Sequence, residues 1–156
     1  MTKPFQSSRH AALQSPAAVP MQFDVRIWRE ADGRLCANIP HSVIWHSPDG
    51  YDCGYGGSGS ADLALNVLNA FVPPGPPLTE EDESERLDEP VKCYRGVCSR
   101  CAARYHQDFK WQFIASMDPT GGRIEASTIQ AWIAERMRPQ QSESPSTQDP
   151  IVQVQS

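Results

Sequence analysis

The sequence predicts an α+β fold, in which a small antiparallel sheet of about three strands is packed by about three helices. Strict alternation of apolar and polar residues over residues 22–29 is typical of a half-buried strand. Three later segments instead carry apolar residues at helical spacing, which predicts amphipathic or buried helices. The 14 prolines lie mostly outside these periodic segments, so they mark the ends of the predicted elements.

The first strands are expected in the order of the chain. Residues 22–29 form a strand, Asp32 and Gly33 supply the positive φ angles of a hairpin turn, and residues 35–39 form the returning strand. We expect a short third strand at residues 42–45, because prolines bracket this apolar segment.

The first helix is expected from residues 61–71 and largely buried, with Asp62, Asn66 and Asn69 as a narrow polar stripe. A Pro-rich acidic insertion then follows at residues 73–91. Its length without periodicity is unusual in a compact domain.

The second helix is expected from residues 102–117. Ser127 and Gln130 have the spacing of a capping box, which predicts that a third helix opens there and buries Met137. Pro139 ends this helix. Among the tryptophans, Trp45 and Trp132 are expected in the core, whereas Trp28 and Trp111 are expected at the surface.

A chain of 156 residues has the length of one domain. We expect that domain at residues 21–139, with disordered tails at residues 1–20 and 140–156, where the sequence is polar and lacks periodicity. Neither an apolar run of bilayer length nor a signal-peptide core is present in the sequence. We therefore expect a cytoplasmic protein without membrane contact, whose cysteines are thiols or metal ligands rather than disulfides.

A glycine-rich loop between a strand candidate and a helix candidate is the most unusual segment, with five glycines from Gly50 to Gly59. Its spacing matches the dinucleotide fingerprint, but that motif belongs to a parallel βαβ unit and the strands here predict an antiparallel sheet. One interpretation is a tight turn beneath Tyr51 and Tyr55. The alternative is that N–H groups at the helix start bind a phosphate, carboxylate or nucleotide. The residues of that alternative are Gly56, Gly57, Ser58, Gly59 and Ser60.

A cysteine cluster at residues 93–101 has the spacing of metal ligands. Two cysteines separated by two residues place two thiolates on one metal. We predict a structural zinc ion held by Cys93, Cys98, Cys101 and, as the nearest fourth ligand, His106. Unpaired thiols and redox chemistry are the alternatives, and the rivals for the fourth position are Cys36, Cys53 and His46.

Charge is distributed unevenly along the chain. The formal net charge of −5 argues against general binding of nucleic acid. Residues 80–89 are strongly acidic, which is typical of a solvated loop, whereas residues 92–110 are basic. The basic stretch leaves a zinc-stabilised nucleic-acid-binding module as an alternative, with the cations Arg95, Arg100, Arg104 and Lys110.

Candidate catalytic residues are few. His46, Asp49 and Ser58 have the residue types of a hydrolase triad, but the same types are also typical of turn caps and helix caps. We therefore expect no catalytic residues.

Four segments carry a resemblance to a known family: residues 47–51, 54–59, 61–66 and 106–110. They resemble the signature of a poorly characterised family of small proteins found in bacteria, phages and other mobile elements. The chain departs from that signature at Cys53, where an aromatic residue is expected, and at Ser60, where proline is expected. The resemblance implies a mobile-element setting and a role against host defence, and it supplies no catalytic residues.

These observations together predict a small non-enzymatic binding protein of a phage or mobile element, which contacts a host protein or protein complex. The first alternative is a nucleotide- or phosphate-binding enzyme built on the glycine-rich loop. The second is the zinc-stabilised nucleic-acid-binding module.

Overall fold

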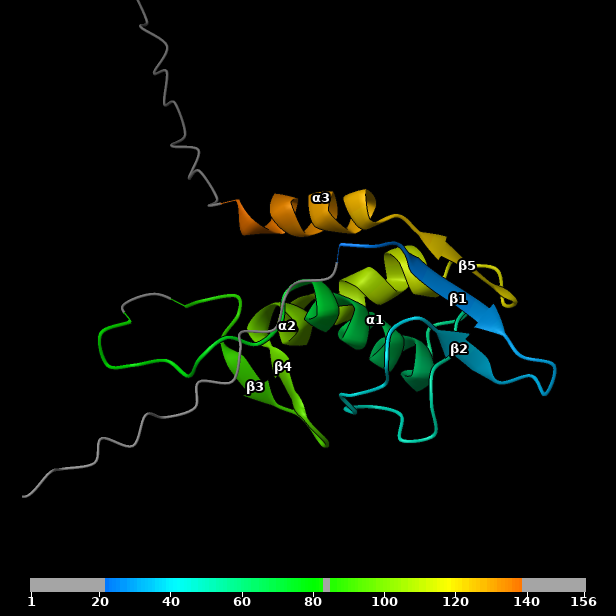
Figure 1. Cartoon of the computed structure of the whole chain (residues 1–156), viewed down its shortest axis with the longest axis horizontal. Helices are drawn as coiled ribbons and strands as arrows, with labels where there is room; N and C mark the ends of the chain where they lie inside the picture. The colour runs from blue at the N-terminus through cyan, green and yellow to red at the C-terminus, as the bar shows by residue number, and fades with distance from the viewer. Residues whose placement is uncertain (1–21, 83–84, 139–156) are drawn as a thin grey trace, which may run out of the picture.

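The computed structural model describes residues 22–82 and 85–138. Within them, three α-helices pack with two small antiparallel sheets, which confirms the predicted α+β class (Figure 1). The tails predicted at residues 1–20 and 140–156 lie outside the described residues.

The larger sheet has the strand order β2–β1–β5, with β1 at Val25–Arg29, β2 at Leu35–Ala37 and β5 at Gly121–Ile124. β1 lies in the centre and turns two buried side chains, Val25 and Ile27, to the core. The prediction of a third strand at residues 42–45 was wrong, because Ile44 makes only an isolated bridge to Arg95.

The third strand is instead β5, which begins at the glycine pair Gly121 and Gly122. β5 pairs with the far edge of β1, about 95 residues away in sequence. Gly121 permits this close approach, because a Cβ there would lie 2.2 Å from the carbonyl oxygen of Ile27 and its φ is +115°.

The helix α1, Ser58–Phe71, lies at the centre of the molecule, and most of its side chains are buried (Figure 1). The helix α2, Arg100–Phe109, packs beside it and continues into the π-helical turn η1, Lys110–Ile114. The helix α3, Ala126–Met137, lies along one side of the molecule, and its Trp132 ring packs against Phe109 of α2 at 5.2 Å between centroids (Figure 1). The shared core includes Phe109, Ile114, Ile129 and Trp132.

The second and third helices differ in detail from the sequence prediction. The segment predicted as one regular helix over residues 102–117 changes to π-helical hydrogen bonding, with the N–H of Ala115 donating to the carbonyl of Lys110 at 2.8 Å. The predicted capping box was wrong: α3 begins at Ala126, one residue before Ser127, and no side chain caps it.

The exposed fractions of the large side chains confirm some of the burial predictions and contradict others. Trp132 is buried, and Trp28 and Trp111 are exposed, as predicted. The prediction that Trp45 belongs to the core was wrong, because 39% of its surface is exposed. Met137 is also exposed at 53%, since it lies in the last turn of α3, beyond the core contacts.

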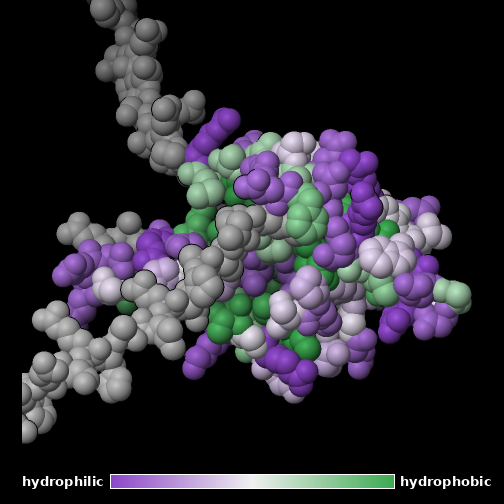
Figure 2. All heavy atoms as spheres, viewed as in Figure 1, coloured by the Kyte–Doolittle hydropathy of each residue, from purple (hydrophilic) through white to green (hydrophobic). Residues whose placement is uncertain are grey.

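The acidic insertion folds back on the basic start of α2. Glu85 pairs with both Arg100 and Arg104, and Glu89 also pairs with Arg100. The insertion leads into a hairpin of β3, Pro90–Lys92, and β4, Val97–Ser99. Its projecting loop is mostly hydrophilic (Figure 2). Two of the four cations proposed for nucleic-acid binding are thus paired with carboxylates of the same chain.

Replacement of Gly121 by alanine should destabilise the protein more than replacement of Gly33. Both glycines have positive φ, so each alanine costs about 1 kcal/mol from backbone strain. A Cβ at Gly33 meets nothing within 4 Å, whereas at Gly121 it collides with β1. We therefore expect a further loss of about 1–3 kcal/mol in Gly121→Ala, measured by urea unfolding. Equal losses in the two variants would contradict the described pairing of β5.

Candidate functional site

A buried carboxylate on α1 holds the segment before the glycine-rich loop. The side chain of Asp62 is fully buried and accepts hydrogen bonds from the backbone N–H groups of Trp45 (3.2 Å), His46 (2.9 Å) and Ser47 (3.0 Å). His41 Nε2 lies 3.2 Å from the same carboxylate. These donors replace the water that the charge loses on burial.

The amide of Asn66 continues this anchoring one helical turn later. Its Nδ2 donates to the carbonyl of Val43 at 2.8 Å, and its Oδ1 accepts from the N–H of Val43 at 3.0 Å. The predicted polar stripe of α1 is therefore buried at Asp62 and Asn66, where it binds the backbone of residues 43–47.

The anchored segment presents His46 to α2. Its Nε2 lies 2.9 Å from Nε2 of His106. Nδ1 of His106 lies 2.9 and 3.0 Å from the carbonyl oxygens of Ala102 and Ala103, so it must carry the proton and donate. Nε2 of His106 is then the acceptor, and His46 donates to it. Burial lowers the pKa of His106, which favours this neutral form.

Trp45 covers the histidine pair from outside. Its ring is stacked on His46 with an interplanar angle of 12° and a centroid distance of 5.5 Å, and it lies 5.3 Å from the ring of His106. The Asp62 hydrogen bonds therefore fix an exposed indole as well as the histidine beneath it.

The glycine-rich loop contacts the start of η1. A Cβ at Gly56 would come within 2.1 Å of the indole of Trp111, so any other residue there would displace that ring. Nζ of Lys110 donates to the carbonyl of Gly56 at 3.2 Å and lies 4.5 Å from the Trp111 ring centroid. Lys110 is itself only 6% exposed, which places a buried ammonium group two residues before α1 begins.

Tyr55 lies on the other side of the loop. Its ring covers Gly57, where a Cβ would lie 2.3 Å from Cε2, and its hydroxyl donates to Asp52 at 2.8 Å. Asp52 also accepts from Arg29 at 2.9 Å. Burial tends to raise the pKa of Asp52, but the hydrogen bonds from Arg29 and Tyr55 outweigh it and lower that pKa. The carboxylate thus orients the tyrosine ring.

These contacts join three chain segments into one surface, which we call the Gly-loop face. Sequence reasoning treated His106 as a metal ligand and Lys110 as one of several cations, and the resemblance placed both in the segment 106–110. Their spacing of four residues on one helical face was the available signal that they act together. The Gly-loop face consists of Trp45, His46, Tyr55, Gly56, His106, Lys110 and Trp111.

The side chains of His46, Asp49 and Ser58 do not form a catalytic triad in the structure. The hydrogen bonds of His46 go to Asp62 and His106. Ser58 is the first residue of α1, whose N-cap is Gly57 and which has no side-chain cap. Ser58 therefore also does not act as the helix cap that the sequence suggested.

The cysteine cluster is divided between two environments. Cys93 Sγ and Cys98 Sγ lie 3.1 Å apart on the β3–β4 hairpin. Burial raises the pKa of the Cys98 thiol, and raises that of Cys101 to about 11. His106 is engaged by His46 and by α2 carbonyls.

In the part of the chain that the structure describes, no group of three or more His, Cys, Asp or Glu side chains is placed to hold a metal ion. The zinc ion at Cys93, Cys98, Cys101 and His106 therefore stays a prediction. Metal analysis of the purified protein tests it.

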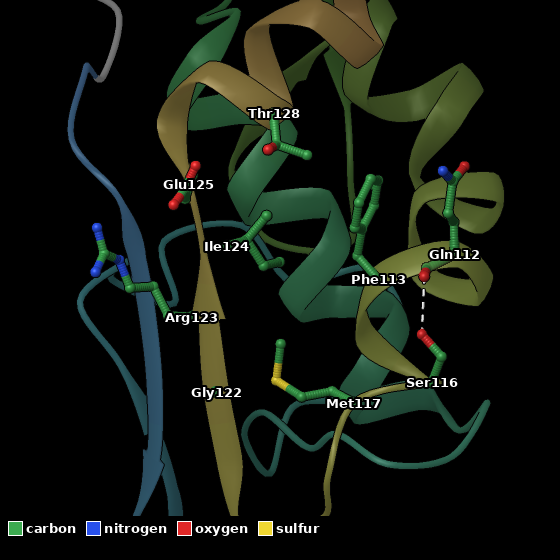
Figure 3. Close-up of a pocket in the computed structure, with 9 residues that line it drawn as sticks. All are labelled: Gln112, Phe113, Ser116, Met117, Gly122, Arg123, Ile124, Glu125 and Thr128. Atoms are coloured by element: carbon green, nitrogen blue, oxygen red, sulfur yellow. Dashed lines mark hydrogen bonds between the residues drawn. The ribbon is translucent and has the colours of Figure 1, made fainter.

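A separate cleft of about 380 Å³ lies between η1, β5 and the start of α3 (Figure 3). Apolar side chains of Phe113, Met117 and Ile124 line it. Arg123, at its edge, pairs with Asp24 and points away from the opening. The cleft has the size of a small-molecule site, but its lining offers no cluster of ionisable groups for catalysis.

Comparison with models of known families, with curated proteins and with solved structures finds no match to this chain. Among the described helices, none has both the length and the apolar character required to cross a bilayer.

Substitution of Asp62 by asparagine should destabilise the protein by about 3 kcal/mol, because hydrogen bonds to a buried charged acceptor are among the stronger ones and an amide cannot accept from all these donors. Thermal or urea unfolding measures the loss. The matched control is Asp49→Asn, an exposed position just after the segment that Asp62 anchors, which should change stability by less than about 0.5 kcal/mol. A similar small effect in both variants would show that Asp62 does not anchor residues 45–47.

Proposed function

We propose that this protein is a non-enzymatic binding protein that contacts another protein through the Gly-loop face. One observation carries the proposal: Trp45, Tyr55 and Trp111 expose 39%, 54% and 60% of their surfaces on the contacting segments of the Gly-loop face. Exposed tryptophan and tyrosine side chains are enriched among the residues that dominate binding energy at protein interfaces.

The backbone beneath these rings is already ordered by internal contacts. Asp62 and Asn66 hold the segment of Trp45, and the Gly56–Trp111 contact holds the loop against η1. A partner that binds this face does not have to order it, so less binding energy is lost to conformational entropy. The buried ammonium group of Lys110 lies beneath this face, against Gly56 and Trp111, and its positive charge favours a partner with acidic groups.

The proposal includes no catalysis. The Nε2 atoms of His46 and His106 hydrogen-bond to each other. Neither Ser58 nor Asp49 takes part in the hydrogen bonds of this pair. The resemblance to proteins of phages and mobile elements supports a setting in the bacterial cytoplasm. There the partner is a host protein or complex, and the proposed role is against host defence.

Replacement of Trp111 or Tyr55 by alanine should weaken binding of the partner at least tenfold, because each removes an exposed aromatic anchor. The partner is first captured from host cells with the wild-type chain, purified, and then titrated against each variant by calorimetry. Trp28→Ala is the matched control, since Trp28 is 42% exposed on β1 but lies outside the Gly-loop face.

Loss of binding in Trp28→Ala but not in Trp111→Ala would place the interface elsewhere. Equal binding by all four proteins would overturn the proposal for this face. Thermal unfolding of each variant controls for lost folding.

Binding of a phosphate or nucleotide is a second candidate function, favoured by Lys110. Its ammonium group lies 3.2 Å from the carbonyl of Gly56, beside the helix start whose first N–H groups have no intrahelical partner. The first turn of α1 contains no acidic residue, and the carboxylate of Asp62 in the next turn is directed toward residues 45–47.

If the loop binds nucleotide, millimolar nucleotide should raise the melting temperature by several degrees, because a ligand that binds only the folded protein stabilises it. Lys110→Met should remove that rise, whereas Lys92→Met, a change at an exposed lysine on β3, should retain it. A flat response of the wild-type chain to phosphate, nucleotides and nucleotide sugars would exclude this candidate.

A further inference from the structure

The β3–β4 hairpin brings two thiols together on one face. Val91 is the register partner of Cys98, and the N–H of Cys93 donates to the carbonyl of Gly96 at 3.1 Å. Cys93 is two residues beyond Val91, so Cys93 and Cys98 are diagonal neighbours across the two strands. Their Sγ atoms lie 3.1 Å apart.

The Sγ–Sγ distance favours two thiols that can form a disulfide over two thiolates that share a metal ion. Two thiolates on one tetrahedral zinc ion, each about 2.3 Å from it, lie roughly 3.8 Å apart. The observed 3.1 Å lies between this value and the roughly 2.05 Å of a disulfide bond, so the two side chains must rotate before the atoms join. We propose that Cys93 and Cys98 form a reversible disulfide that closes the β3–β4 hairpin.

The two cysteines differ in their access to solvent. Cys93 is partly exposed, whereas Cys98 is fully buried beneath the hairpin. Cys53 and Cys101 are buried as well. An oxidant in solution therefore meets Cys93 before Cys98.

The oxidant is a low-molecular-weight disulfide such as oxidised glutathione. The Cys93 thiolate attacks one sulfur of that disulfide, which breaks its S–S bond and releases one thiolate. Cys98 then loses its proton to solvent, and its Sγ attacks Cys93 Sγ of the mixed disulfide and releases the second thiolate. Two protein thiols are oxidised to one disulfide, and one small disulfide is reduced to two thiols.

Closure of the hairpin acts on the segment that carries Trp45. Arg95, at the hairpin tip, exchanges two backbone hydrogen bonds of 2.9 Å with Ile44. Gly96 packs so closely that a Cβ there would lie 2.8 Å from the carbonyl oxygen of Ser42. A covalent link between the strands restricts the hairpin in the unfolded chain and so supports this contact.

The test equilibrates the full-length protein in glutathione buffers that range from fully reduced to fully oxidised. After an acid quench and unfolding, iodoacetamide labels the free thiols, and peptide mass spectrometry locates the unlabelled ones. We expect Cys93 and Cys98 to lose two hydrogens together in oxidising buffer, while partly exposed Cys36 stays labelled. The melting temperature of the oxidised form should rise by roughly 5 °C.

Cys93→Ser should remove both the bridge and the rise, and Cys36→Ser should leave both unchanged. Cys93 is partly exposed, so the serine is compatible with folding. Three outcomes would overturn the proposal: both thiols labelled in every buffer, a bridge from either cysteine to another residue, or stoichiometric zinc that protects the thiols in reduced protein purified without chelator. A disulfide that forms without any rise in melting temperature would contradict the proposed stabilisation of the contact between the hairpin and residues 42–44.

Discussion

The buried charge of Asp62 is the interaction on which the rest of the candidate site depends. A carboxylate without solvent is stable only when donors surround it, and here the donors are backbone N–H groups of three consecutive residues. The same bonds that satisfy the charge determine where Trp45 and His46 lie. The need to satisfy a buried carboxylate in the core thus determines where Trp45 and His46 lie at the surface.

The helix α1 transmits this constraint because it is packed on almost every side. Its N-terminal end meets the glycine-rich loop, its polar stripe holds residues 43–47, and α2 with η1 lies along it. The π-helical turn places Lys110 and Trp111 against Gly56. π-Helical turns inside helices recur at functional sites, which agrees with the position of this one under the Gly-loop face.

Charge has a structural use in the second half of the chain. The acidic insertion neutralises Arg100 and Arg104, and this pairing ties the loop to the start of α2. The β3–β4 hairpin lies between this contact and the segment of Ile44. The disulfide proposed above would therefore act on the segment that carries Trp45.

The sequence alone determined the elements whose signals are local: the alternating strand β1, the apolar helix α1 and the exposure of Trp28 and Trp111. It also singled out the glycine-rich loop, because so many glycines require a close approach of other groups. Only the tertiary structure decided that Asp62 is buried, that β5 completes the sheet and that Lys110 reaches Gly56. Each of these features depends on contacts between different segments of the chain. Local periodicity does not indicate which distant residue will hydrogen-bond to a buried charge or pair with an open strand edge.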